Sequence, residues 1–213
     1  MLNLDLQTRI DAAVEQNIAP DEYFSVWEEP GVWQLDALRS VGMNPSHRLL
    51  DVGCGAMRLG VYATDYLDDG NYFGIDAFPP YIAAGRRLAQ AAGLTKKFSL
   101  LASKEFEFDR FGVKFDYANA QSVLTHLSGE ECHRCMAALQ KVMKPGGIFL
   151  LTYLVGRPMT QGLLYGGMQS MRRFAETDPE FFVKLGQSHG ATFEKLEMPH
   201  PTGQQVGLYR FPG

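Results

Sequence analysis

The chain has 213 residues, of which 46% are hydrophobic and 21% charged, as in an ordinary globular protein. Its net charge of −4 argues against a nucleic-acid partner, because a large nucleic-acid interface normally needs a basic face. No apolar run approaches the ~18 residues of a membrane span, and residues 1–17 lack the apolar block of a signal peptide. We therefore expect a cytoplasmic protein without a membrane partner.

The first 45 residues are expected to form an N-terminal helical cap. Leu6, Ile10 and Val14 follow helical spacing, which predicts a short amphipathic helix at the start of the chain. The segment 17–31 contains two prolines and is expected to be irregular, and helical spacing resumes over 32–41. The aromatic residues of this cap would form either a flap over a ligand or part of the core; they are Tyr23, Trp27 and Trp33.

From residue 48 onward, short apolar segments alternate with helical patterns. Strands are predicted at 48–52, 72–75, 98–101, 115–120, 148–155, 191–197 and 206–211, and helices at 58–67, 79–92, 129–142 and 178–189. This alternation is typical of a doubly wound α/β sheet that binds its ligand at the carboxyl ends of the strands. The segment 158–177 is rich in Gly and Met without a clear period, and it is expected to cover the substrate within a single domain spanning 1–213.

The run LLDVGCGAMRLG at residues 49–60 is the most informative stretch of the chain. An apolar strand ends in Asp51, and Gly53 and Gly55 follow, which predicts a tight turn whose backbone can approach a ligand. A second short strand ends in Asp76, 21 residues after Gly55. A carboxylate at that point suits bidentate hydrogen bonding to ribose hydroxyls, so the ligand is expected to contain a nucleoside.

The residues of the glycine turn distinguish between cofactors. A dinucleotide-binding turn reads GxGxxG, whereas the run from Gly53 reads GCGAMR and lacks the third glycine. The carboxylate of Asp51 would repel a phosphate and attract an amine. Both features argue against an NAD-dependent oxidoreductase.

Together with residues 115–127 and the KPGG turn at 144–147, these motifs resemble the class I S-adenosylmethionine-dependent methyltransferase family over nearly the whole chain. The resemblance implies a Rossmann-like, seven-stranded sheet, mostly parallel with an antiparallel last strand. It also implies S-adenosyl-L-methionine as cofactor and methyl transfer to a small organic acceptor, with O-methylation favoured over N-methylation. The alternative is a cofactor-binding or partner-binding domain without transfer activity.

The sequence departs from the family pattern at two points. Met57 stands where the family usually has its third glycine, and Gly60 follows three residues later. The third strand lacks the acidic residue that usually contacts the adenine amine. Ser103 or a backbone amide is the expected substitute.

Asp51 would receive the amino group of the cofactor, and Asp76 would hold its ribose hydroxyls. Phe78 would pack either on the adenine ring or in the core. Gln121 follows the fourth strand and would contact the cofactor or substrate, or use its amide locally. The resemblance thus implies a cofactor site made of Asp51, Gly53, Cys54, Gly55, Asp76, Ala77, Phe78, Ser103 and Gln121.

His126 is the candidate general base for a substrate hydroxyl, because its ordinary pKa near 6.5 suits proton transfer. Alternatively, it would hydrogen-bond the loop that positions Gln121. The candidate substrate residues are Tyr153, Arg157 and His200. Arg157 would pair with a carboxylate or phosphate, or simply lie at the surface.

The remaining polar motif is the C-x-x-C pair formed by Cys132 and Cys135. It falls inside a predicted helix and has no second pair, so no metal site is expected. The sequence is compatible with a monomer or a homodimer that acts on a small molecule.

Overall fold

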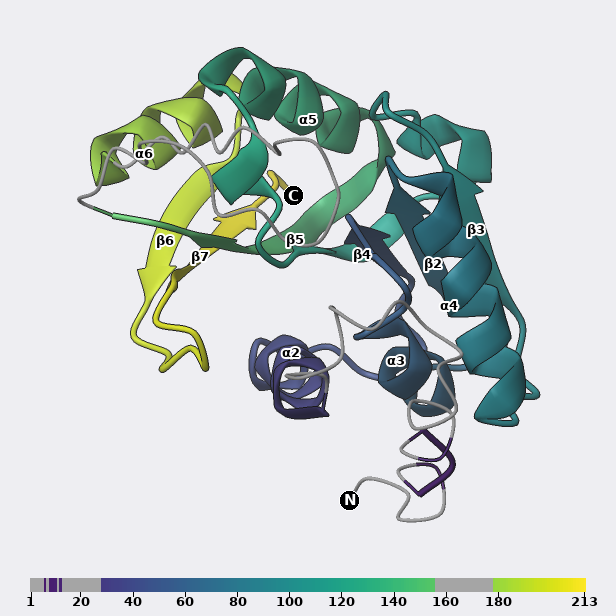
Figure 1. The fold of residues 1–213 in the computed structure, drawn as a ribbon. Coiled ribbons are helices and arrows are strands. Elements are labelled where there is room, and N and C mark those ends of the chain that lie inside the picture. Colours follow the sequence, from purple (N-terminus) through teal and green to yellow (C-terminus); the bar gives the residue numbers. More distant parts are fainter. Residues whose placement is uncertain (1–5, 7, 11, 13–27, 156–177) are drawn as a thin grey trace. The chain divides into compact units, whose positions relative to one another are not determined.

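The computed structural model describes residues 6, 8–10, 12, 28–155 and 178–213, so the expected cover segment 158–177 lies outside the described residues. Seven strands form one sheet in the order β3-β2-β1-β4-β5-β7-β6 (Figure 1). In chain order they are β1 (Leu49–Val52), β2 (Tyr72–Asp76), β3 (Phe98–Ala102), β4 (Phe115–Ala120), β5 (Met143–Tyr153), β6 (Thr192–Leu196) and β7 (Gln205–Arg210). The pairs β1–β2, β2–β3 and β4–β5 are parallel, and β7 is antiparallel to both of its neighbours. The predicted α/β fold class is confirmed.

The chain divides into two compact units, Met1–Glu105 and Phe106–Gly213. In the first unit, β1 and β2 are buried, as expected of parallel strands covered on both faces. Their register pairs Val52 with Ile75, and β2 pairs Asp76 with Ala102 of β3. Because parallel strands end at the same edge of a sheet, the turn after β1 and the carboxylate that ends β2 lie next to each other.

The helices of the first unit are α2 (Glu28–Ser40), α3 (Gly60–Tyr66) and α4 (Pro79–Ala91). Helix α2 begins before the predicted residue 32, so the expectation of an irregular segment up to residue 31 was wrong at its end. Pro30 lies in the first turn, where its missing N–H has no intrahelical partner to lose. Gly31 lies against the ring of Tyr62 on α3, where a Cβ would approach within 2.7 Å. It therefore allows α2 and α3 to pack closely, as Figure 1 shows.

The start of the chain agrees with the predicted amphipathic helix at the residues that are described. Residues 6, 8–10 and 12 are helical. Leu6 and Ile10 are buried, one turn apart on one face. Tyr23 and Trp27 lie outside the described residues, and Trp33 is half-buried on α2.

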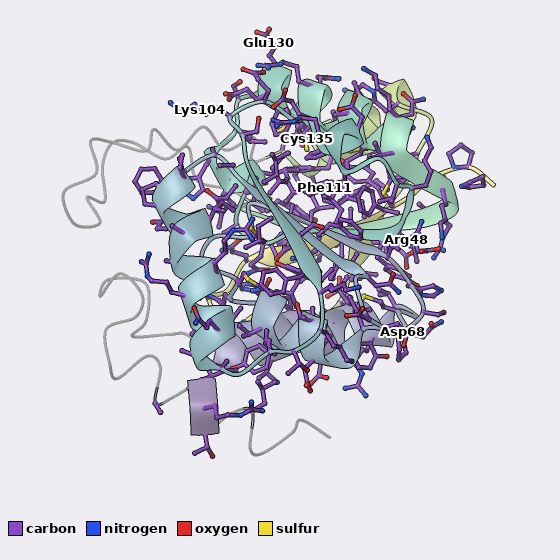
Figure 2. All side chains as sticks on the ribbon, turned by 90° about the vertical axis from the view of Figure 1, so that its right-hand side faces the viewer. Arg48, Asp68, Lys104, Phe111, Glu130 and Cys135 are labelled. Atoms are coloured by element: carbon purple, nitrogen blue, oxygen red, sulfur yellow. The ribbon has the colours of Figure 1, made fainter. Side chains whose placement is uncertain are left out.

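The helices of the second unit are α5 (Gly129–Val142) and α6 (Pro179–Ser188), with short 3-10 turns η2 (Phe108–Phe111) and η3 (Leu124–His126). Ser128 caps α5 in a reciprocal capping box with Glu131. Helices α5 and α6 lie side by side (Figure 1). On α5, Cys135 is buried among interior side chains while Glu130 projects outward (Figure 2).

Strand β5 differs from its predicted range of 148–155. It begins at Met143 and includes residues 144–147, so the KPGG segment is part of the strand rather than a turn before it. The register with β4 shifts between Phe115 and Tyr117, which marks a bulge that accommodates the extra residues. The strand ends at Tyr153. In the described ranges, no helix is both long and apolar enough to cross a membrane.

Candidate functional site

The glycine turn after β1 is attached to the end of β2 by its own backbone. The N–H groups of Gly53 and Cys54 both donate to the carbonyl oxygen of Ile75, at 2.8 and 3.0 Å. Gly53 and Gly55 have φ angles of 68° and 54°, in the left-handed region that L side chains rarely adopt. The two glycines predicted from the sequence therefore meet a backbone requirement.

Asp76 lies directly beside this turn. Its Oδ2 accepts a hydrogen bond from the Gly55 N–H at 2.9 Å, and its Oδ1 accepts one from the Phe78 N–H at 2.8 Å. A carboxylate oxygen accepts from two directions, so each oxygen keeps a second direction for a ligand hydroxyl. Burial raises the pKa of Asp76, and the hydrogen bonds from Phe78 and Gly55 partly offset that rise.

Asp51 is buried, with 3% of its surface exposed. Its Oδ2 accepts a hydrogen bond from the hydroxyl of Tyr72 at 2.7 Å. The sequence did not single out Tyr72. The register of β1 and β2 explains the contact, because residues level with each other on neighbouring strands share a face, and Tyr72 is level with Leu49, two residues before Asp51.

The other residues expected at the cofactor site are placed as follows. Cys54 is buried, and burial raises the pKa of its thiol, with the charges of Asp51 and Asp76 adding to the rise. Ala77 is exposed, and Phe78 is an exposed large side chain, 36% accessible, whose ring meets Tyr81 edge to face. The core alternative for Phe78 therefore loses support, because a core ring would be covered.

Ser103 is close to Asp76 through its backbone. Its N–H donates to the carbonyl oxygen of Asp76 at 2.9 Å. Its hydroxyl makes local hydrogen bonds with the backbone of Glu105. The structure thus places Ser103 at the edge where β2 and β3 end.

Met57 explains the missing third glycine of the family pattern. It adopts the left-handed conformation, with φ of 67°, and its side chain is fully buried. A Cβ at Gly60 would approach the Met57 Cβ within 2.9 Å, and a Cβ at Gly85 would approach its Cγ within 2.9 Å. Glycines on α3 and α4 therefore leave the space that the Met57 side chain fills.

In the second unit, the structure brings together Gln121 and His200, which are 79 residues apart. The Nε2 of His200 contacts the side-chain amide of Gln121. Its Nδ1 lies 3.1 Å from the N–H nitrogen of Thr202 and 3.4 Å from that of Gln204. Two N–H donors facing Nδ1 require it to accept, so the neutral ring carries its proton on Nε2. That proton is donated to the Gln121 amide, which must therefore present its oxygen.

Ser122, next to Gln121, is a second non-glycine residue with a left-handed backbone, at φ of 57°. Its N–H donates to the buried hydroxyl of Thr152 at 2.8 Å. Its own hydroxyl accepts from the side-chain amide of Gln204 at 2.7 Å. Strain held in this way is often found at functional sites. Ser122 lies in the segment 115–127 that resembles the family, and Gln204 lies in the polar turn that begins at His200, but nothing in the sequence singled out Thr152.

Two of the remaining candidates, His126 and Tyr153, lie in the described part of the chain. His126 is half-buried in η3, and its backbone N–H donates to the carbonyl oxygen of Val123. Tyr153 is 1% exposed, and its ring lies 4.4 Å from that of Phe182 in an aromatic core. Arg157 lies outside the described residues. In the described part of the chain, no group of three or more His, Cys, Asp or Glu is arranged to hold a metal ion.

The state of His200 leads to an expected dependence of stability on pH. Burial lowers its pKa below the ordinary 6.5. As the pH falls below 6.5, the unfolded chain therefore takes up a proton that the folded protein refuses, and the free energy of unfolding falls until the folded pKa is passed. Urea unfolding at a series of pH values measures this slope, and His200→Gln should remove part of it.

A slope unchanged by His200→Gln would contradict the assigned protonation state. A separate contribution should remain in this variant, because burial and the neighbouring His133 also lower the pKa of His189.

Comparison with known proteins places the chain among related folds. Residues 50–149 match a family model described as a methyltransferase domain. An uncharacterised protein of Rickettsia prowazekii is 28% identical over 117 residues, which are 53% of this chain and 46% of that protein. The match thus spans about half of each of the two chains.

Among the similar solved structures, three methyltransferase-fold neighbours cover most of the chain. A magnesium protoporphyrin IX methyltransferase from Synechocystis, solved with bound S-adenosylmethionine, has a TM-score of 0.65 and 14% identity over 97% of both chains. DesVI from Streptomyces venezuelae has a TM-score of 0.66 and 14% identity, covering 87% of this chain and 93% of that one. The CcbJ methyltransferase from Streptomyces caelestis has a TM-score of 0.65 and 16% identity, covering 88% and 95%. At these identities the likeness is one of fold.

Proposed function

We propose that the chain is a class I S-adenosylmethionine-dependent methyltransferase that transfers the cofactor's methyl group to a small organic acceptor, since residues 50–149 match a methyltransferase-domain model. The observation that carries the proposal is the Asp76 carboxylate, which Gly55 and Phe78 hold in place by backbone hydrogen bonds. Both oxygens keep a direction for a hydroxyl, which suits the two neighbouring hydroxyls of a ribose. The ordered carboxylate loses little further entropy when it binds.

Each candidate site residue of the first unit has a proposed role in binding the cofactor. Gly53 and Gly55 let the backbone approach the methionine portion, and Asp51 receives its amino group, directly or through water. Phe78 packs on the adenine ring, since its exposed face is available for that purpose. Cys54, Ala77 and Ser103 complete the edge, with Ser103 close to Asp76.

In the second unit, we assign Gln121 to a cofactor or substrate contact. The contact with His200 is placed on the Gln121 amide nitrogen. The His200 tautomer assigns the amide the other way round, with its oxygen toward His200 and its NH₂ group presented as a donor. A donor of this kind suits an oxygen of the ligand. His200 would therefore act on the substrate indirectly, by orienting the side chain of Gln121.

The bound cofactor supplies a methyl group on a positively charged sulfur, which leaves as a neutral thioether. The nucleophile of the acceptor forms the new bond to the methyl carbon as the carbon–sulfur bond breaks, and the nucleophile loses a proton. The protein's main task is to align the reactants, which can supply about 7–11 kcal/mol in favourable intramolecular models. His126 is our proposed base where that proton has to be removed, as for an alcohol.

A small organic acceptor is supported by the fold. One similar structure is a methyltransferase of magnesium protoporphyrin IX. O-methylation is favoured over N-methylation, because a histidine base is useful for a hydroxyl nucleophile and dispensable for a neutral amine.

Calorimetry of the purified chain with S-adenosylmethionine, S-adenosylhomocysteine and NAD tests the cofactor. We expect the first two to bind in the micromolar range and NAD not to bind, because the turn lacks a third glycine and carries Asp51 before the first. Binding of NAD alone, or of none of the three, would contradict the proposal. Radiolabelled methyl transfer to a panel of phenols, alcohols and amines then tests catalysis. Cofactor binding without transfer to any of them would favour a cofactor-binding domain.

A further inference from the structure

The carboxylate expected to meet the cofactor's amino group is itself held by a side chain outside the known motif. Asp51 is 3% exposed and Tyr72 is 1% exposed. Their hydrogen bond, from the Tyr72 hydroxyl to Oδ2, is 2.7 Å long. A buried carboxylate is costly unless donors satisfy it, so this hydroxyl strongly affects both the orientation and the charge of Asp51.

The position of the hydroxyl is fixed by its surroundings. Tyr72 is level with Leu49 in the parallel pair, so its side chain shares a face with Asp51 and reaches along the strand toward it. At the tip of the Tyr72 side chain, a Cβ on Gly60 would come within 2.6 Å of the hydroxyl oxygen. The first residue of α3 is therefore a glycine that leaves room for this hydroxyl.

Tyr72 also remains a donor across the neutral range. Burial raises the pKa of its phenol, and the charge of Asp51 raises it further. The Tyr72 hydroxyl therefore keeps its proton at neutral pH and donates it to the Asp51 carboxylate.

We propose that Tyr72 is a positioning residue for the amino-acid end of the cofactor: its hydroxyl fixes the Asp51 carboxylate in the rotation that receives the ammonium group. The inference rests on the proposed function. It differs from a general structural role in one respect. Loss of the hydroxyl should weaken ligands that carry the amino group and should spare ligands that lack it.

Two nucleosides make this distinction. S-adenosylhomocysteine carries the amino-acid end, whereas 5′-methylthioadenosine has the same adenine, ribose and sulfur without it. In calorimetry, Tyr72→Phe should bind S-adenosylhomocysteine about tenfold more weakly, as expected for the loss of one hydrogen bond to a charged group. Its affinity for 5′-methylthioadenosine should change by less than about twofold.

The matched control is Tyr66→Phe in the same unit. The Tyr66 hydroxyl donates to the carbonyl oxygen of Met43 at 3.1 Å, so its loss also removes one tyrosine hydrogen bond but leaves Asp51 untouched. Tyr66→Phe should leave the ratio of the two affinities at the wild-type value. Where Tyr72→Phe does not fold, Gly60→Ala displaces the same hydroxyl. Its Cβ would also approach the Met57 Cβ, so the readout in this variant is the ratio of the two affinities, which should fall for the ligand that carries the amino group.

An equal change for both ligands, or unchanged binding of S-adenosylhomocysteine, would overturn the role of Tyr72. Failure of the wild-type chain to bind either nucleoside would instead overturn the proposed function, and the inference with it. The two failures are therefore distinguishable in a single set of titrations.

Discussion

Asp76→Ala is expected to weaken S-adenosylhomocysteine binding by about 5- to 150-fold, which corresponds to roughly 1–3 kcal/mol for polar groups left without partners. The substitution removes the proposed acceptor of two ribose hydroxyls. It also removes the acceptor of the Gly55 and Phe78 N–H groups, so the glycine turn loses its attachment to the end of β2 at that point. Calorimetry at constant pH measures the loss.

A ligand that lacks one ribose hydroxyl tests whether Asp76 binds the ribose. The 2′-deoxy form of S-adenosylhomocysteine lacks one of the two hydroxyls, so wild type should bind it more weakly while Asp76→Ala binds both forms alike. Asp36→Ala, which removes an exposed carboxylate on α2, should leave both affinities unchanged. Equal discrimination between the two ligands in Asp76→Ala and wild type would contradict the ribose assignment.

Those parts of the fold that depend on local sequence could be predicted closely. Strand β4 and helix α5 match the predicted ranges of 115–120 and 129–142. Helix α5 begins with a complete capping box, and β4 is a short segment in which four of six residues are apolar. The spacing between Gly55 and Asp76 predicted that both lie at the carboxyl ends of neighbouring strands. The hydrogen bond between them shows that they are in contact.

Features that depend on pairing between segments could not be predicted in the same way. The contact between Gln121 and His200 joins the end of β4 to the β6–β7 turn, and nothing local to either residue indicates the other. The hydrogen bond from Tyr72 to Asp51 requires the register of β1 and β2. The bulge in β5 likewise appears only when the register with β4 is known, since the KPGG sequence alone is equally typical of a turn.

Restoring the family's third glycine with Met57→Gly is expected to destabilise the protein, although the substitution relieves backbone strain. The left-handed backbone of a non-glycine residue costs about 1–2 kcal/mol of stability. Glycine removes this strain but loses more conformational entropy on folding, so only part of that free energy is recovered. The fully buried Met57 side chain contributes more, because its removal from a packed core costs about 2–5 kcal/mol. Gly60 and Gly85 cannot fill the space they leave for it. We expect a net loss of about 1–3 kcal/mol in the free energy of unfolding, measured in urea.

Met57→Ala separates the two contributions. It removes most of the same packing while it keeps the left-handed strain, so it should be less stable than Met57→Gly by roughly 1 kcal/mol. The order of stability is then wild type, Met57→Gly and Met57→Ala. A Met57→Gly protein more stable than wild type would mean that the strain at this turn outweighs the packing, and that the glycines on α3 and α4 have another cause. The expected order would instead mean that the packing of the Met57 side chain, in the space next to Gly60 and Gly85, outweighs the strain of its left-handed backbone.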